Sequence, residues 1–463
     1  MRSRHLRSRG VLRGVALCAA VGTLTLGGPT APAVGQTIGP PPLDESQKAS
    51  SRVDAISGDY EQKQGCMQRN TGNSLIEEKP WSQLVLGYER AHEQGITGAG
   101  QTVAVIDTGV NQHPRLQHLR GGDSALPGGA TTDCDGHGTL VAGIIGAAPD
   151  ETGQTGYVGV APDATILSIR QTSRLWSSRA NSSTVGNTHT LAQAINSAVA
   201  SGATVINISQ SSCQPIAQAA NPADWGNQQL HNAVRDAYNA GVVVVAAAGN
   251  ADQVCQKNPV GSPTTAVLPA WFDDYVLTVA SVNQQGAPSE FTVPGPWVDV
   301  AAPGENLIGL DPGAGGRGLA SQITEGQNGQ LGPIQGTSFA APYVAGLAAL
   351  IKQKFPQLSP KQVMDRITQT ALHPGGINGR NDIVGYGMID PMAALGDILP
   401  SEYGKQAPPP KQTRLQADVI PQKDFPALIV AMGGAGAGIA AIIFTAFLVN
   451  AVRNVRARTR GNR

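Results

Sequence analysis

Three polar side chains in this 463-residue sequence have the residue types and local settings that nucleophilic catalysis requires. Asp107 directly follows a short apolar run, His137 lies between two glycines just before another, and Ser338 comes shortly before a third. A serine nucleophile needs a base that accepts its proton and a carboxylate that orients the base. A serine at a helix N-terminus also has a free backbone N–H that can stabilise an oxyanion. The order Asp, His, Ser therefore indicates hydrolysis by a serine nucleophile.

The segment Asp107-Thr108-Gly109 also matches a sequence that aspartic proteases use. That mechanism requires two facing carboxylates that share one proton. The chain contains no second Asp-Thr-Gly and no Asp-Ser-Gly, and a homodimer that supplies the second carboxylate suits much shorter chains. The sequence therefore favours the serine mechanism.

The elements that must position these side chains are short β-branched runs that alternate with helical spacing from Thr102 to about Ile398. Short, nearly all-apolar strands separated by helices indicate a mainly parallel sheet covered by helices on both faces, which is a three-layer α/β fold. Ligands bind at the carboxyl ends of such strands, where Asp107 lies. The predicted strands are 103–106, 165–169, 205–208, 242–246 and 276–279, and the clearest predicted helices are 191–200 and 230–240.

Composition is that of a globular protein, with 41% hydrophobic and 14% charged residues. The 33 basic and 33 acidic residues balance, but ten arginines lie in the two terminal segments. Residues 34–450 therefore hold 23 basic and 33 acidic side chains, a net charge of −10. An acidic body argues against nucleic acid as a partner.

The first 33 residues have the features of a secretory signal peptide. Five arginines precede the apolar run 15–26, and the small-residue sequence Ala31-Pro32-Ala33 follows it. This arrangement predicts cleavage after Ala33. The alternative is an uncleaved anchor, but the run is shorter than the roughly 20 residues that span a bilayer.

Residues 425–452 contain no charged side chain and are long enough to cross a membrane as a helix. Five arginines follow in the tail 453–463, so the positive-inside rule places the C-terminus in the cytoplasm and the body outside. A buried core helix is the alternative, and the arginine tail disfavours it. The Pro-rich segment 399–424 is predicted to be a spacer between body and membrane.

Removal of the signal peptide takes Cys18 away and leaves four cysteines, which are Cys66, Cys134, Cys213 and Cys255. Four cysteines in an exported chain predict two disulfides, and three pairings are possible. Free buried thiols are the alternative.

Over residues 81–398 the chain resembles the subtilisin-like serine proteases, or subtilases. The resemblance implies that Ser338 is the nucleophile, His137 its general base, and Asp107 the carboxylate that orients the base. It also implies that the Asn250 side chain and the Ser338 backbone N–H form the oxyanion hole. The segments that carry it are Val-Ala-Val-Ile-Asp-Thr-Gly-Val at 103–110, Gly-His-Gly-Thr at 136–139, Ala-Ala-Ala-Gly-Asn at 246–250, Ala-Ala-Pro-Gly at 301–304 and Gly-Thr-Ser-Phe-Ala-Ala-Pro at 336–342.

The resemblance narrows to the mycosins, the membrane-anchored subtilases of actinobacterial type VII secretion. Four features together indicate this group of subtilases. They are the segments 133–137 and 168–173, the position of Cys213, and the succession of signal, spacer and anchor. Similarity to mycosins implies cleavage of secreted protein substrates and stabilisation of the secretion membrane complex on its outer side. A mainly non-proteolytic scaffold subunit that retains the fold is the alternative.

Within this fold, Cys213 and Cys255 follow the ends of two neighbouring strands by four and five residues, so they are expected to pair. Cys66 would then pair with Cys134, beside the loop that carries His137. Residues 34–80 are therefore expected to be a structural wrap around the protease domain rather than a removed inhibitor.

By the same resemblance, two short segments should line the pocket for the substrate residue before the cleaved bond. They are Ser209, Gln210 and Ser211, and Ala247, Ala248 and Gly249. Ser211 stands where subtilases usually have a glycine. No loop has the carboxylate-rich sequence of a calcium site, and the mechanism implies no metal or cofactor. Three long irregular stretches are expected to flank the cleft, at 172–187, 210–227 and 312–332.

Overall fold

The computed structural model of the chain describes five stretches, which are residues 39–70, 75–325, 330–375, 377–403 and 440–454. The chain divides into two units, Met1–Ile398 and Leu399–Arg463. The sheet and the candidate site belong to the first unit, and the following paragraphs concern that unit unless they say otherwise.

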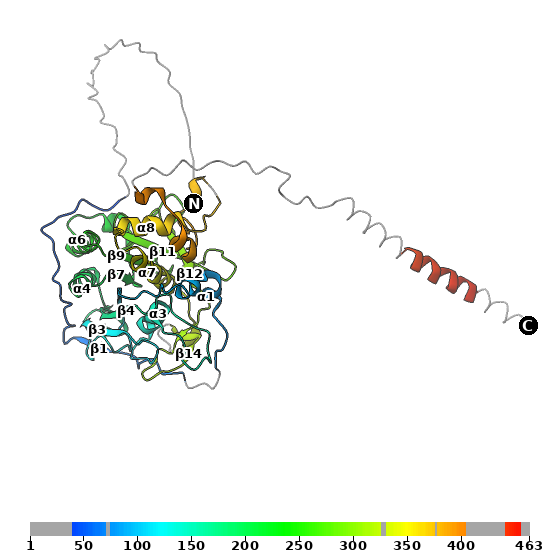
Figure 1. Cartoon of the computed structure of the whole chain (residues 1–463), viewed down its shortest axis with the longest axis horizontal. Helices are drawn as coiled ribbons and strands as arrows, with labels where there is room; N and C mark the ends of the chain where they lie inside the picture. Colours follow the sequence, from blue (N-terminus) through cyan, green and yellow to red (C-terminus); the bar gives the residue numbers. More distant parts are fainter. Residues whose placement is uncertain (1–38, 71–74, 326–329, 376, 404–439, 455–463) are drawn as a thin grey trace, which may run out of the picture. The chain divides into compact units, whose positions relative to one another are not determined.

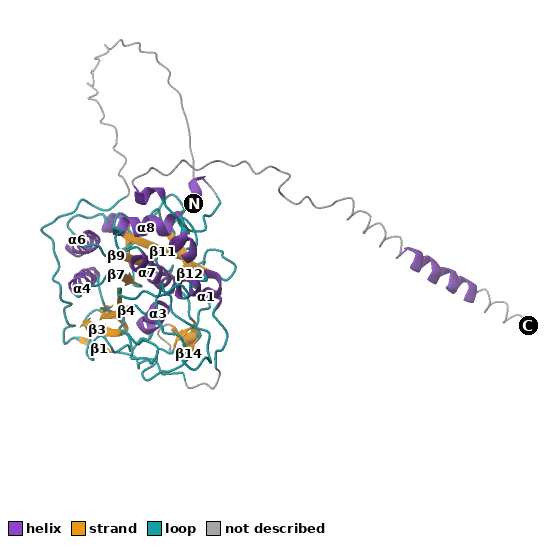
Figure 2. Cartoon of the chain, in the orientation of Figure 1, coloured by secondary structure: helices purple, strands orange, loops and turns teal. Residues whose placement is uncertain are grey.

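A seven-stranded sheet forms the centre of the first unit, and each neighbouring pair of its strands is parallel (Figure 2). All five predicted strands belong to it; 205–208 has the predicted bounds, and the bounds of the other four differ by one to three residues. Its order is β12 (Val300–Pro303), β11 (Val276–Val282), β9 (Val243–Ala247), β7 (Val205–Ile208), β2 (Thr102–Asp107), β4 (Thr165–Arg170) and β3 (Leu119–Ser124).

Helices cover both faces of the sheet, as predicted. Successive residues of a strand point to opposite faces, so Val103 and Val105 of β2 contribute to one hydrophobic cluster and Ala104 and Ile106 to the other. The first cluster includes residues of α3 (His137–Gly146) and α7 (Thr337–Lys354), and the second includes residues of α4 (Thr188–Ala200) and α6 (Trp225–Asn239). In Figure 1 the labels of β9, β7 and β4 lie between these two pairs of helices.

The predicted helices begin earlier than their apolar spacing indicated, because polar side chains cap them. Asn187 accepts a hydrogen bond from the Thr190 N–H at the start of α4, and Asp224 accepts one from the Asn227 N–H at the start of α6. Helix α7 contains Pro342 in its second turn, which is unusual inside a helix.

The stretches expected to be irregular contain short paired strands. In 172–187, β5 (Ser173–Ser178) pairs with β6 (Thr184–Val185) and with β1 (Tyr60–Gln62) from the N-terminal segment. The expectation of irregular structure was wrong, and one of the two partners, β1, comes from a distant part of the sequence. The other pairs are β8 (Ser212–Pro215) with β10 (Thr265–Leu268), β13 (Gly309–Leu310) with β14 (Leu319–Ala320), and β15 (Gln322–Glu325) with β16 (Gln330–Pro333).

The remaining helices are short, apart from α8. They are α1 (Trp81–Leu86), α2 (Glu89–His92), α5 (Ile216–Ala219), α8 (Pro360–Gln369), α9 (Pro391–Gly396) and the 3₁₀ turn Ile377–Gly379. A further 3₁₀ turn, Pro400–Tyr403, belongs to the second unit.

Two disulfides join the pairs expected from the sequence. Cys66 is bonded to Cys134 with a Cα–Cα distance of 4.4 Å, and Cys213 is bonded to Cys255 at 5.1 Å. The first bond fastens the N-terminal segment three residues before His137.

In the second unit, residues 440–454 are helical. In the part of the chain that the structure describes, no helix is long and apolar enough to cross a membrane. Residues 425–439 of the predicted membrane helix and the whole predicted signal peptide 1–33 lie outside that part.

Gly346 allows α7 to pack closely against the segment that follows α3. An ideal Cβ at this position would lie 2.6 Å from the Val160 Cβ, closer than carbon atoms pack. Gly346→Ala is therefore expected to lower the free energy of unfolding by about 1–3 kcal/mol, as overpacking does. Urea unfolding followed by tryptophan fluorescence measures the change. Gly396→Ala is the matched control, because a Cβ there meets nothing within 4 Å. Equal stability of the two variants would contradict the close contact.

Candidate active site

Asp107 and the half-buried His137 form a hydrogen-bonded pair where β2 ends and α3 begins. The His137 Nδ1 lies 2.7 Å from Oδ1 of Asp107, whose side chain is fully buried. The backbone N–H of Thr108 donates to the same oxygen at 2.7 Å. The other carboxylate oxygen, Oδ2, is buried without a hydrogen-bond partner among the described residues. Such a carboxylate stabilises the positive charge that the imidazole acquires when it takes a proton.

Ser338 is the second residue of α7, as expected for a nucleophile at a helix start. Gly336 precedes the helix with a φ of 143°, a conformation that L side chains rarely adopt. An ideal Cβ on Gly336 would lie 3.0 Å from Oγ of Ser338 and 3.1 Å from Nδ2 of Asn250. The hydroxyl of Ser338 and the amide of Asn250 therefore face the same small space.

The neighbouring Phe339 links Ser338 to His137. Its ring centroid lies 4.8 Å from that of His137. The start of α7 is thus packed against the start of α3, and the structure brings all four predicted catalytic positions to one end of the sheet.

Asn250 is held by its carbonyl oxygen. Oδ1 accepts hydrogen bonds from the Thr337 N–H at 2.9 Å and from the Thr337 hydroxyl at 3.0 Å. Two donors on the oxygen orient the amide, so its N–H groups point away from Thr337. This orientation suits a side chain that donates a hydrogen bond to an oxyanion.

The backbone carbonyl of Ser338 has an unusual partner. Pro342 lacks the N–H that would bond to this carbonyl in a regular helix. The Ser209 hydroxyl donates to it instead, at 2.6 Å, and the Asn207 amide donates to the Ser209 oxygen at 2.9 Å. Ser209, predicted from the resemblance as a pocket residue, therefore supports the backbone of Ser338. Pro342 was the available sequence signal, because a proline inside a helix leaves one carbonyl without its partner.

The predicted pocket residues differ in exposure. Ser209, Ala247, Ala248 and Gly249 are buried, Gln210 is half-buried, and Ser211 is exposed. A Cβ on Gly249 would lie 3.5 Å from the Cys255 Sγ, so the second disulfide lies directly beside this segment.

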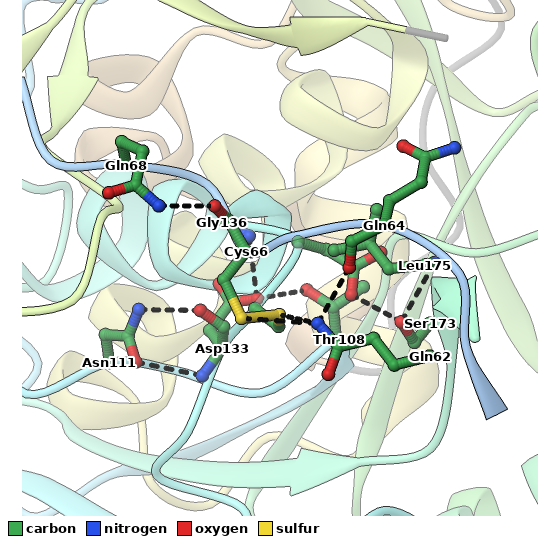
Figure 3. The surroundings of a disulfide bond; sticks show 12 residues. Gln62, Gln64, Cys66, Gln68, Thr108, Asn111, Asp133, Gly136, Ser173 and Leu175 are labelled. Atoms are coloured by element: carbon green, nitrogen blue, oxygen red, sulfur yellow. Dashed lines mark hydrogen bonds between the residues drawn. A yellow bond between two sulfur atoms is a disulfide. The ribbon is translucent and has the colours of Figure 1, made fainter. Parts of the chain in front are cut away.

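The sequence motif does not reveal that Asp133 is a buried acid, bonded to Thr108 and Gly136, the residues next to Asp107 and His137. Figure 3 shows it beside Thr108. Burial raises the pKa of its carboxyl from 3.8 to about 6, against the opposing effect of hydrogen bonds from Thr139 and Thr108. In the described ranges, no cluster of three or more His, Cys, Asp or Glu side chains could hold a metal ion.

A parallel three-layer fold that carries a buried Asp hydrogen-bonded to a His, beside a helix-start serine, defines the subtilisin-like class of serine peptidases. Residues 98–387 match the model of the subtilase family. The chain is 42% identical to Mycosin-4 of Mycobacterium tuberculosis, over 91% of this chain and 93% of that protein.

Solved structures are also similar to the chain, and they include two that cover most of it. One is the serine protease MycP1, an essential component of the type VII (ESX-1) secretion system, with a TM-score of 0.69, 39% identity, and coverage of 78% of this chain and all of that one. The other is an intact ESX-5 inner membrane complex, with a TM-score of 0.70, 34% identity, and coverage of 88% and 99%. The chain belongs to the subtilase family of serine peptidases and, within it, to the mycosins.

The raised pKa of Asp133 predicts a pH dependence of stability. Between pH 3.8 and about 6 the folded chain holds a proton on Asp133 that the unfolded chain has lost. The free energy of unfolding should therefore fall as the pH rises through this window, by on the order of 3 kcal/mol from this group. Asp133→Asn should remove this component, which urea unfolding at pH 4, 5, 6 and 7 measures.

Asp150 provides the control for this experiment. Hydrogen bonds from Thr152 lower the pKa of this exposed carboxyl. Asp150→Asn should therefore still show the fall in the free energy of unfolding as the pH rises. Identical pH slopes for wild type and Asp133→Asn would contradict the prediction.

Proposed function

We propose that the protein is an extracytoplasmic, membrane-anchored endopeptidase that cleaves secreted proteins in a type VII secretion system. The observation that carries the catalytic part is the 2.7 Å contact of His137 with the buried Asp107, next to the space shared by Ser338 and Asn250. The similarity to MycP1 and to the ESX-5 complex supports the link to type VII secretion.

In the first half of the proposed reaction, Ser338 Oγ attacks the carbonyl carbon of the scissile bond. The serine proton moves to Nε2 of His137, and Asp107 stabilises the imidazolium through Nδ1–H. The carbonyl oxygen becomes an oxyanion that accepts hydrogen bonds from the Asn250 amide and the Ser338 backbone N–H. Loss of one such donor typically costs about 3 kcal/mol of transition-state stabilisation.

In the second half, His137 gives its proton to the leaving amine, and the carbon–nitrogen bond breaks. The acyl group stays on Ser338 as an ester. A water molecule then attacks the ester carbon and passes its proton to His137, which returns it to Ser338 Oγ. The enzyme is regenerated without a cofactor or a metal.

The domain organisation that we propose follows the sequence. Residues 1–33 are a signal peptide, the segment 399–424 is a spacer, and 425–452 is the membrane helix that precedes the cytoplasmic tail 453–463. Charge asymmetry and hydropathy support this orientation. The domains in between are the extension 34–80 and the peptidase domain 81–398.

Contacts of the extension support its role as a retained wrap. Besides the disulfide and the β1–β5 pairing, the Asn232 amide of α6 donates to the backbone oxygens of Asp44 and Gln47 at 2.8 and 2.9 Å. These contacts are spread over the extension from Asp44 to Cys66, and a cut after Cys66 would leave it joined to the peptidase domain through the disulfide.

A second candidate function is that of a scaffold subunit. The similarity to a chain in the ESX-5 inner membrane complex favours it, because that chain is part of an assembly. The two functions are compatible, since docking needs the folded surface and proteolysis needs the triad.

Ser338→Ala separates the two functions. Without the hydroxyl no acyl-enzyme can form, so cleavage of the secreted substrates should fall by at least about a thousandfold. Secretion of those substrates should continue if the scaffold role is separate. Matched membrane preparations of wild type and variant are compared for both. Ser201→Ala, at the C-terminal end of α4, is the control and should cleave normally.

Asn250→Ala gives a graded result in the same assay, with cleavage reduced by about a hundredfold to a thousandfold. Unchanged cleavage in Ser338→Ala would refute the catalytic assignment and leave only the scaffold function. Loss of cleavage and secretion together would mean that secretion requires proteolysis.

The proposed topology predicts the accessibility of a tag. A tag placed after residue 463 should resist external protease in intact spheroplasts and be digested after permeabilisation, because the arginine tail keeps it in the cytoplasm. A tag within 399–424 should be digested in both conditions. Digestion of the C-terminal tag in intact spheroplasts would contradict the orientation.

A further inference from the structure

The carboxylate of Asp133 accepts four hydrogen bonds in the interior. Its Oδ1 accepts from the Thr108 hydroxyl and the Gly136 N–H, both at 2.8 Å. Its Oδ2 accepts from the N–H of Thr139 at 2.9 Å and from the Thr139 hydroxyl at 2.7 Å. The residue is 3% exposed. Figure 3 shows it between the side chains of Thr108 and Asn111, next to the disulfide.

These donors flank the Asp107–His137 pair. Thr108 directly follows Asp107, whereas Gly136 and Thr139 lie on either side of His137. The N-cap position of α3 has no side-chain hydrogen bond of its own. Asp133 satisfies two of the free N–H groups at the start of this helix. One carboxylate therefore joins the end of β2 to the first turn of α3.

Thr108 is fixed from two further directions. Its hydroxyl oxygen accepts the Gly138 N–H at 3.0 Å, and its backbone carbonyl accepts Nε of the buried Arg170 at 3.0 Å. The residue beside Asp107 is thus bonded to α3, to Asp133 and to Arg170 of β4.

Asn111 closes the network. Its side chain accepts the Asp133 N–H at 2.9 Å and donates to the Asp133 carbonyl at 2.7 Å. Its own backbone N–H donates to the Thr139 hydroxyl at 2.9 Å. The turns 108–111 and 133–139 are therefore connected by side-chain as well as backbone groups.

We infer that Asp133 is a positioning residue that holds the first turn of α3 against the end of β2, so that His137 stays hydrogen-bonded to Asp107. The inference rests on the proposed function of the triad. It requires a carboxylate, because an asparagine offers one oxygen and an NH₂ group that would face two of the four donors. The raised pKa of Asp133, at about 6, still leaves the carboxyl ionised at neutral pH.

A merely structural role makes a different prediction. An acid that only starts a helix would affect the fraction of folded protein, not the reactivity of each folded molecule. A positioning residue affects the reactivity of Ser338, because His137 must be held in place to accept its proton.

The test measures the reaction of Ser338 with a fluorophosphonate probe, which needs no known substrate. In this reaction Oγ of Ser338 bonds to phosphorus, fluoride leaves, and His137 takes the serine proton. The full-length protein in detergent is labelled at a series of probe concentrations. The measurement yields a maximal rate and a half-saturating concentration, normalised to folded protein by circular dichroism.

Asp133→Asn should lower the maximal rate by roughly tenfold to a hundredfold, with little change in the half-saturating concentration. It should also shift or abolish the low-field proton NMR resonance of the His137 Nδ1–H. Thr108→Val, which removes one donor but keeps the shape, should act in the same direction. Thr108→Ser, which keeps the hydroxyl, should restore the wild-type rate and resonance.

Each outcome decides one question. A wild-type rate in folded Asp133→Asn, or a reduced rate with an unchanged low-field resonance, would overturn the positioning role. If Asp133→Asn fails to fold, the comparison of Thr108→Val with Thr108→Ser replaces it. Equal maximal labelling rates for these two variants would overturn the positioning role. Ser338→Ala tests the proposed function separately, because labelling of this variant at the wild-type rate refutes the triad whatever Asp133 does.

Discussion

The site depends on one interaction, the hydrogen bond between the His137 ring and the buried carboxylate of Asp107. A buried carboxylate is unfavourable unless hydrogen bonds or a positive charge offset its desolvation. The fold must therefore end β2 and begin α3 at the same point and keep water away from both. The position of β2 between β7 and β4 in the sheet and the apolar residues of α3 and α7 provide this enclosure.

The parallel sheet explains how residues far apart in the chain meet. Strands β2, β7 and β9 are consecutive neighbours in the sheet, and Asp107, Ser209 and Asn250 lie at or just after their carboxyl ends. Helix α7 brings Ser338 to the same edge. Pro342 leaves the Ser338 carbonyl without a helical partner, and the Ser209 hydroxyl replaces the missing donor. The serine after β7 thus provides the hydrogen bond that the proline in α7 removes.

The N-terminal extension contacts the same region from outside. Its disulfide fastens Cys66 to Cys134, next to the acid that bridges β2 and α3. Strand β1 gives β5 a partner and orders a stretch whose own sequence has no strong strand pattern. The extension therefore contributes to the structure around the His137 loop.

The sequence by itself determined the order of strands and helices and, through motifs that resemble those of subtilases, the four candidate catalytic residues. The cysteine pairing followed once the resembled fold placed two strands side by side. Apolar runs and motifs are local patterns, so they are visible in one dimension. The tertiary structure alone decided that Asp133 accepts four hydrogen bonds, that Ser209 supports the Ser338 carbonyl, and that β1 pairs with β5. Each of these requires the distance between groups from separate segments, which packing sets and sequence spacing does not.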